Sequence, residues 1–149
     1  MHEAAYDGRS PVVELLLDQQ GIEVNQADRA GQTALHVAAK RGHTNVLMLL
    51  VNFPGINLAA TNCEGETFLH KLAAKANCDP ETLRNLLGNL DVDPNVRNLK
   101  GNTPIMELLL SNSNHNNVAQ CLRAMVQSDR VDILCGKARH GGSLVHLLW

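Results

Sequence analysis

The sequence predicts an all-α fold, a solenoid of stacked helix–turn–helix units with hairpin-like fingers. A motif of the form Gly-x-Thr/Ser-x-x-His recurs at residues 31–36, 65–70, 101–106 and 141–146, with Met106 in place of the third histidine. Successive copies begin 34, 36 and 40 residues apart, and a period of about 20–50 residues is the signature of a repeat architecture. Aromatic residues make up only 3% of the chain and hydrophobic residues 44%. Small and aliphatic side chains must therefore fill the interior, which suits closely packed helices.

Each unit contains signals for a short first helix. Thr33 is placed to cap a helix that begins near Ala34, and Pro104 stands at the same place in the third copy, where its missing N–H costs nothing. Ala38 and Ala39 give this helix small side chains that let neighbouring helices approach closely. Gly42 is expected to end the helix and permit a tight turn.

A second helix with an apolar face follows in each unit. Its apolar residues are expected to bury one side against adjacent helices; they are Val12, Val13, Leu15, Leu16 and Leu17 in the first unit and Val46, Leu47, Leu49, Leu50 and Val51 in the second. A turn and an extended stretch come next, at residues 21–25 and 55–58, and the chain then reaches the next motif glycine. This return predicts a hairpin-like finger.

The pattern Asp28-x-x-Gly31-x-Thr33-Ala34-Leu35-His36-x-Ala38-Ala39-x-x-Gly42-His43 resembles the ankyrin repeat. The resemblance covers nearly the whole chain, is almost complete over 28–60 and is weakest in the fourth unit. It implies a single domain, 1–149, made of a partial unit 1–27, units 28–61 and 62–97, an irregular unit 98–136 and a partial unit 137–149. Because both ends fall within repeats, we expect a piece of a longer protein or a small protein with unusual caps.

The C-terminal third departs from the pattern. Residues 77–80 suggest an inter-helix loop about three residues longer than its counterpart in the second unit. The polar run 111–117 predicts a long linker, and 127–139 lacks the usual finger residues. We expect residues 100–149 to keep the stack but to distort it.

The recurring histidines His36, His70 and His146 raise the question of a metal site. They occupy equivalent positions in successive units, whose helices lie about 8–10 Å apart, so they cannot share one ion with bonds of about 2 Å. The ankyrin resemblance implies instead that each histidine hydrogen-bonds the threonine of its own motif. We expect no metal and no cofactor.

Catalytic motifs are missing from the sequence. It has no Gly-rich phosphate loop, no HExxH and no Ser/His/Asp arrangement, and the pairs Asp79-Pro80 and Asp93-Pro94 are expected only to shape turns. No cysteine pair forms CxxC. We expect free thiols, with Cys63 at a fingertip, Cys78 in a loop and Cys121 in the core, and no enzymatic activity or small-molecule substrate.

Charge and hydropathy limit the partners. The formal net charge is −2, from 13 basic and 15 acidic residues, which does not favour nucleic-acid binding. The longest apolar runs span about six residues, too short for a membrane helix, and the N-terminus does not resemble a signal peptide. The cysteine pattern and the lack of Asn-x-Ser/Thr sequons favour an intracellular location, cytoplasmic or nuclear.

The ankyrin resemblance implies that partners bind a concave face built from the fingers and first helices. Carried over to this sequence, the variable positions of that face are Tyr6, Asp7, Arg29, Ala30, Gln32, Lys40, Arg41, Cys63, Glu64, Glu66, Lys75, Ala76, Leu99, Lys100 and Asn102. Their mixed charge suits a protein or peptide that itself carries both signs. Solvated surface charge is the alternative for any single residue.

Asn25 has a second interpretation. Its setting, Leu17-x5-Glu23-Val24-Asn25, resembles the site hydroxylated by an asparaginyl oxygenase in ankyrin proteins, and Asn95 is a weaker match because Pro94 precedes it. The favoured alternative is that both side chains close the finger by hydrogen bonds to backbone.

Together these features predict a protein–protein interaction module that acts as an intracellular scaffold or adaptor. Two alternatives stay open. The stack resembles ankyrin-type inhibitors that block a kinase or a transcription factor, and it could also be the docking arm of a larger enzyme or channel.

Overall fold

The computed structural model describes residues 1–74, 79–111 and 115–131. These ranges contain α-helices and no strand, as the sequence predicts. The helices are α1 (His2–Asp7), α2 (Ser10–Leu17), α3 (Ala34–Arg41), α4 (Thr44–Val51), α5 (Phe68–Ala73), α6 (Pro80–Gly88), α7 (Pro104–Leu110) and α8 (His115–Val126). We call α1/α2, α3/α4, α5/α6 and α7/α8 pairs 1 to 4.

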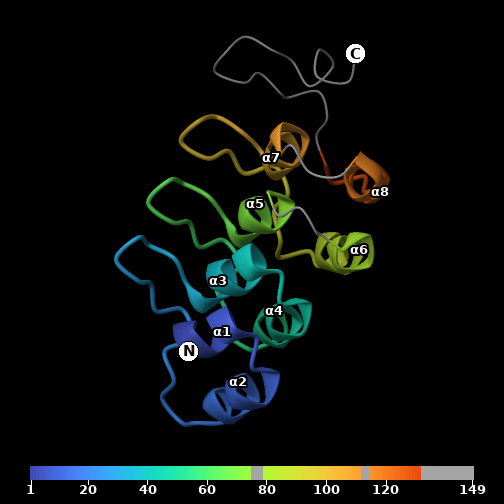
Figure 1. The fold of residues 1–149 in the computed structure, drawn as a ribbon. Coiled ribbons are helices and arrows are strands. Elements are labelled where there is room, and N and C mark those ends of the chain that lie inside the picture. Colours follow the sequence, from blue (N-terminus) through green and yellow to red (C-terminus); the bar gives the residue numbers. More distant parts are fainter. Residues whose placement is uncertain (75–78, 112–114, 132–149) are drawn as a thin grey trace.

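The helix pairs stack in sequence order into two columns. Figure 1 shows the inner helices α1, α3, α5 and α7 in one column, the outer helices α2, α4, α6 and α8 in the other, and long loops projecting from the inner column. The inner helices pack closely because alanines lie fully buried between them, among them Ala5, Ala38, Ala39 and Ala73. One hydrophobic core runs through all four pairs.

The predicted helix ends are confirmed. Thr33 is the N-cap of α3 and forms a capping box with His36, while Gly42 closes the helix with φ 76° in the left-handed region. Pro104 occupies the first turn of α7. Asp79 caps α6, because its carboxylate accepts hydrogen bonds from the backbone N–H groups of Glu81 and Thr82.

The expected burial of the outer helices is correct for α4 and wrong for part of α2. In α2 only Val13 is fully buried, whereas Val12 and Leu15 are 39% and 65% exposed. The reason is that α2 packs mainly against α1 and α4, so much of its other side faces away from the helices that the structure describes.

The polar linker predicted at 111–117 is shorter than expected, because α8 already begins at His115. Asparagine is a weak helix former, but the first-turn amides of a helix need no intrahelical partner, which makes polar residues tolerable there. The extended inter-helix loop at 77–80 falls largely outside the described residues, as does the predicted partial unit 137–149. The unit boundaries remain predictions; one helix pair lies in each of the first four predicted segments.

None of the helices in the described ranges is both long enough and apolar enough to span a bilayer.

Candidate protein-binding face

Three turns of the same construction form the finger tips. In each, one side-chain oxygen accepts two backbone N–H groups: Asp28 from residues 30 and 32, Asn62 from residues 64 and 66, and Asn98 from residues 100 and 102. This is the local bonding by which Asp and Asn favour turns. We call residues 28–32, 62–66 and 98–102 fingers 1, 2 and 3, and the surface that they form with the inner helices the finger face.

Backbone hydrogen bonds tie each finger to the next. The N–H of Cys63 donates to the carbonyl of Ala30 at 3.0 Å, and that of Leu99 donates to the carbonyl of Glu64 at 2.9 Å. Gly31 is required at the first contact: its φ is 74°, and a Cβ there would lie 2.9 Å from the nitrogen of Cys63. The fingers therefore hold a fixed spacing and present their side chains at defined intervals.

The motif histidines hold the inner helices to the fingers. In His36, Nδ1 accepts the backbone N–H of Thr33 at 3.2 Å and lies 2.9 Å from its hydroxyl, while Nε2 lies 2.9 Å from the carbonyl oxygen of Glu66. His70 repeats the arrangement with Thr67 and Asn102. The predicted His–Thr pairing is thus confirmed for both residues.

The bond from each histidine to the next unit was not predicted. A carbonyl can only accept, so Nε2 carries a proton. Nδ1 accepts the backbone N–H of the threonine and therefore carries none, which makes the imidazole neutral. Burial lowers the pKa values of His36 and His70, in keeping with that neutral state.

His2 makes the same kind of contact with the next unit, because its Nε2 lies 2.8 Å from the carbonyl oxygen of Gln32. His146 lies outside the described residues, and no group of three or more potential metal ligands gathers within them.

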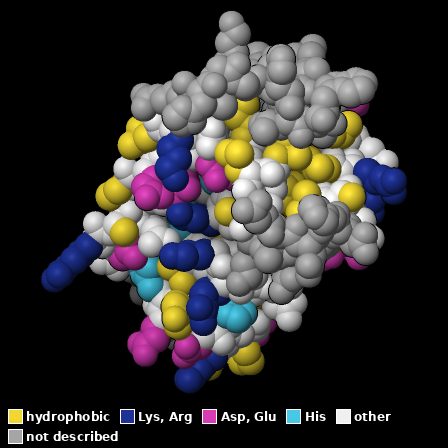
Figure 2. Space-filling view, turned by 45° about the horizontal axis from the view of Figure 1, so that its top comes forward, with side chains coloured by type: hydrophobic (Ala, Val, Ile, Leu, Met, Phe, Trp, Pro, Cys, Tyr) yellow, Lys and Arg dark blue, Asp and Glu magenta, His cyan; other side chains and the backbone are white. Residues whose placement is uncertain are grey.

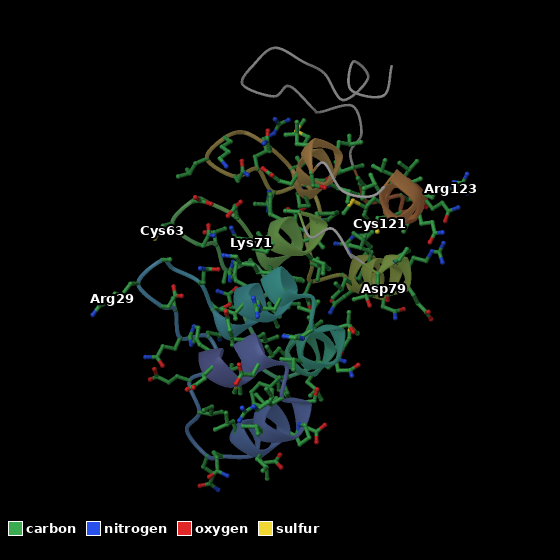
Figure 3. All side chains as sticks on the ribbon, in the orientation of Figure 1. Arg29, Cys63, Lys71, Asp79, Cys121 and Arg123 are labelled. Atoms are coloured by element: carbon green, nitrogen blue, oxygen red, sulfur yellow. The ribbon has the colours of Figure 1, made fainter. Side chains whose placement is uncertain are left out.

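Lys71 is a charged member of the finger face that the sequence analysis missed. Its ammonium group pairs with the carboxylate of Glu66 and lies 3.6 Å from that of Glu64. Burial would raise the pKa of Glu66, but hydrogen bonds from Lys71 and Asn62 outweigh it and lower the pKa to about 2. Figure 3 shows Arg29 and Cys63 at the tips of successive fingers and Lys71 between finger 2 and α5.

The signal for Lys71 was its place directly after the motif histidine. Glu107 occupies the equivalent place in pair 4, where its carboxylate accepts hydrogen bonds from the side chains of Asn98 and Asn102. This position therefore faces the finger of its own unit, and a charge there marks a contact with that finger.

Tyr6 of α1 and Arg41 of α3 stack on each other at the N-terminal end of the finger face. The guanidinium of Arg41 lies 4.0 Å from the centre of the Tyr6 ring, and His43 bonds the carbonyl oxygen of Tyr6 at 2.9 Å. Tyr6 is nevertheless 51% exposed. The pair offers a flat aromatic and cationic surface held in one orientation, and both residue types are frequent binding hot spots.

The remaining predicted binding residues fall into three groups. Exposed ones are Asp7, Arg29, Ala30, Lys40, Cys63, Glu64, Leu99 and Lys100. Gln32 is half-buried, while Glu66 and Asn102 are buried at 7% exposure each. Lys75 and Ala76 lie outside the described residues. In Figure 2, Lys and Arg side chains follow one another across the face in view and acidic side chains lie beside them.

Cys63, Cys121 and the Asp93-Pro94 pair lie as the sequence predicts, whereas Asp79-Pro80, expected only to shape a turn, begins α6 with Asp79 as its N-cap. Cys63 is exposed, Cys121 is buried, and neither is part of a disulfide. Cys78 lies outside the described residues. Asp93 accepts the N–H of Asn95 and so shapes its turn.

The Asn25 side chain forms hydrogen bonds to backbone groups, but these groups belong to the next unit and not to its own. Its side-chain amide donates to the carbonyl of Gly55 at 2.8 Å and its oxygen accepts the N–H of Asn57 at 2.7 Å, so it links the loop of pair 1 to that of pair 2. Asn95 donates to the carbonyl of Arg130 in the same way, at 2.7 Å. The structural interpretation holds, with the neighbouring unit as the partner.

The stacked pairs, their capped inner helices and their linked fingers define a helical repeat protein. The family model for ankyrin repeats (3 copies) matches residues 1–98, and the chain belongs to the ankyrin-repeat family. Ankyrin repeats generally mediate protein–protein interaction, and the family is typically non-catalytic. A comparison with curated proteins returned no match.

Proposed function

We propose that this chain binds a protein or peptide on its finger face and acts as a scaffold or adaptor. The observation that carries the proposal is the set of charges held in place there. Lys71 is fixed between Glu64 and Glu66, and Arg41 is fixed on Tyr6. Groups that are already ordered lose little conformational entropy on binding, which favours affinity and specificity.

The partner is an extended segment of mixed charge. Exposed basic groups at Arg29, Lys40 and Arg41 attract acidic side chains, whereas exposed Glu64 attracts basic ones. Fingers of fixed spacing match the regular spacing of side chains along such a segment. Leu99, 65% exposed on finger 3, adds an apolar contact at the other end.

Reversal of two charges on the finger face tests the proposal. A Lys40→Glu/Arg41→Glu variant should lose at least about tenfold in affinity for a partner captured by the wild type. Both basic side chains that attract acidic groups of the partner become acidic, and Arg41 is of a residue type that is often a binding hot spot. Arg84→Glu/Arg123→Glu makes the same change of charge on exposed positions of the outer helices α6 and α8 and should leave binding unchanged. Pull-down followed by calorimetry measures both, with circular dichroism to verify folding.

Capture of the same partner at equal affinity by all three proteins would contradict the assignment of the face. A blocked active site or DNA-binding surface in the captured partner would favour the inhibitor alternative over the scaffold. Covalent continuation into a catalytic or channel domain in the natural polypeptide would favour the docking arm.

Hydroxylation of Asn25 is a separate proposal, and it concerns the loop after α2 instead of the finger face. Its support is the sequence around Asn25. Because the side-chain amide bonds Gly55 and Asn57, an oxygenase would have to reach the residue while pair 1 is open. Intact mass after co-expression with the oxygenase should show one added oxygen that an Asn25→Ala variant lacks; an unmodified mass would contradict it.

A further inference from the structure

Arg130 fills a cradle of backbone carbonyl groups in the loop that follows α6. One guanidinium nitrogen donates to the carbonyls of Leu87 at 3.1 Å and Asn89 at 2.5 Å, and the other to those of Leu90 at 3.0 Å and Val92 at 2.6 Å. The rigid fork of five N–H donors makes arginine the side chain best suited to such a ring of acceptors. The loops of pairs 3 and 4 are joined by this contact.

The loop of pair 2 follows the same course 36 residues earlier. The N–H of Val92 donates to the carbonyl of Asn89 at 3.2 Å, and the N–H of Ile56 donates to the carbonyl of Phe53 at the same distance. Matching turns place matching carbonyls, so the counterparts of the cradle residues are Val51, Phe53, Pro54 and Ile56.

A cleft occupies the place of the arginine at this junction. Its volume is about 540 Å³, within the range of ligand sites in proteins, and its lining consists of residues 51–59 together with Asn89 and Asp91. All four counterparts of the cradle residues are part of that lining. The cradle of pair 2 is therefore open.

The residue equivalent to Arg130 is acidic at this junction. Val131 donates its N–H to the carbonyl of Ser128, and Val92 donates its N–H to the carbonyl of Asn89 in the same kind of turn. Val131 and Val92 are therefore equivalent positions. The residue before Val131 is Arg130, and the residue before Val92 is Asp91. The cleft thus combines backbone acceptors with a carboxylate, a set that attracts a cation with several donors. Ala59 stands where the neighbouring pairs have Asn25 and Asn95, so no amide bridges from that position either.

We propose that this cleft binds an arginine side chain of a protein partner, in the way that the loop of pair 3 binds Arg130. A guanidinium would donate to the loop carbonyls and to Asp91. Guanidinium is less strongly hydrated than ammonium and stays charged, so arginine is preferred to lysine. The site involves the outer loops and none of the finger-face residues, so it gives the stack a second contact that is independent of the first.

Titration with N-acetyl-arginine amide, followed by amide chemical shifts, tests the proposal. Binding of one side chain is weak, with a Kd on the order of 1–10 mM, and the shifts should saturate and concentrate at residues 51–59 and 89–91. The citrulline analogue, which has the same shape without the charge, should bind at least about fivefold more weakly.

An Asp91→Arg variant tests the same idea within the chain. Its guanidinium should fill the cradle of pair 2, abolish the response to the arginine probe and raise Tm by about 2–6 °C. Glu23→Arg is the matched control: it makes the same charge change in the loop of pair 1, where Asn25 already bridges to pair 2, and should change neither probe binding nor Tm.

The proposal would be overturned by shifts scattered over the surface instead of these loops, by equal binding of the citrulline analogue, or by an unchanged response in Asp91→Arg. Concentration-dependent association of the wild type that Asp91→Arg removes, seen by sedimentation, would make a second copy of the chain the occupant and overturn it as well.

Discussion

Pairs 2 and 3 begin with a histidine motif, whereas pair 4 has Met106 in the same position. The imidazole of His36 or His70 accepts the backbone N–H of its own threonine and also reaches a carbonyl of the next finger. The sulfur of Met106 accepts the N–H of Thr103 at 3.5 Å, and a thioether has no proton to donate. The histidine therefore performs two tasks, a local cap and a bond between units, and methionine retains only the weaker part of the first.

Two devices hold neighbouring pairs together. His36 links pair 2 to pair 3 and His70 links pair 3 to pair 4 through the buried inner column, while Arg130 adds a second link between pairs 3 and 4 through the loops of the outer column. Met106 in place of the motif histidine therefore removes no bond between pairs 3 and 4. The following predictions test how far these devices are equivalent.

His36→Met should have the largest effect, a loss of about 2–4 kcal/mol in the free energy of unfolding. It leaves the buried carbonyl of Glu66 without the donor that the imidazole supplies and the hydroxyl of Thr33 without its partner. Urea denaturation followed by circular dichroism measures it. Met106→Leu, which removes only the sulfur contact, is the control and should cost less than about 1.5 kcal/mol. Equal losses would mean that the histidine bond to the next unit contributes nothing.

Acidification should weaken the stack next most strongly. Burial lowers the pKa values of His36 and His70 below 6.5 in the folded chain, so the unfolded chain takes up protons first as the pH falls. The free energy of unfolding should decline below about pH 6.5, by at most about 1.4 kcal/mol per pH unit for each histidine. The pKa of Glu66 is about 2, so its carboxylate stays ionised through this window. Urea denaturation at about pH 7.5 and about pH 5 provides the measurement.

The His36→Met protein should show a shallower pH dependence than the wild type, because one of the two buried imidazoles is gone. A free energy of unfolding that is the same at both pH values would contradict the neutral state inferred for these side chains.

Arg130→Met should cost about 1–3 kcal/mol, because four carbonyl contacts of a charged donor are lost. Hydrogen exchange should locate the loss in α8 and the loop after α6 and leave α3 protected. Arg123→Met, on the exposed side of α8, is the control with no expected effect. Uniform loss of protection across all pairs would show that the clamp stabilises the whole stack instead of its last junction.

Gly31→Ala should destabilise the chain by about 1 kcal/mol more than Gly21→Ala. Both glycines have φ near the left-handed region, at 74° and 78°, so both substitutions carry the same backbone strain. A Cβ at Gly31 meets finger 2 at 2.9 Å, while one at Gly21 has open space around it. The difference in Tm therefore isolates the contact between fingers, and identical values would mean that the fingers separate at little cost.

Contacts could be predicted from the sequence where the interacting residues are close together in the chain. Capping by Thr33, the αL end at Gly42 and the His–Thr pairs involve neighbours within four residues, and each was predicted. The exposed fingertip at Cys63 and the buried Cys121 followed from position in the period. Lys71 was missed because its partners depend on how finger 2 folds back over α5.

The sequence by itself determined the repeat, the helix ends and the residue types on the finger face. These features rest on local bonds and on apolar periodicity, which a single unit already carries. Only the tertiary structure decided which groups meet across the stack: His36 with a carbonyl 30 residues on, Asn25 with the next loop, and Arg130 with carbonyls 38 to 43 residues back. The physical reason is that such contacts depend on the offset between neighbouring units, which is set by packing of the inner helices and not by the local preferences of either partner.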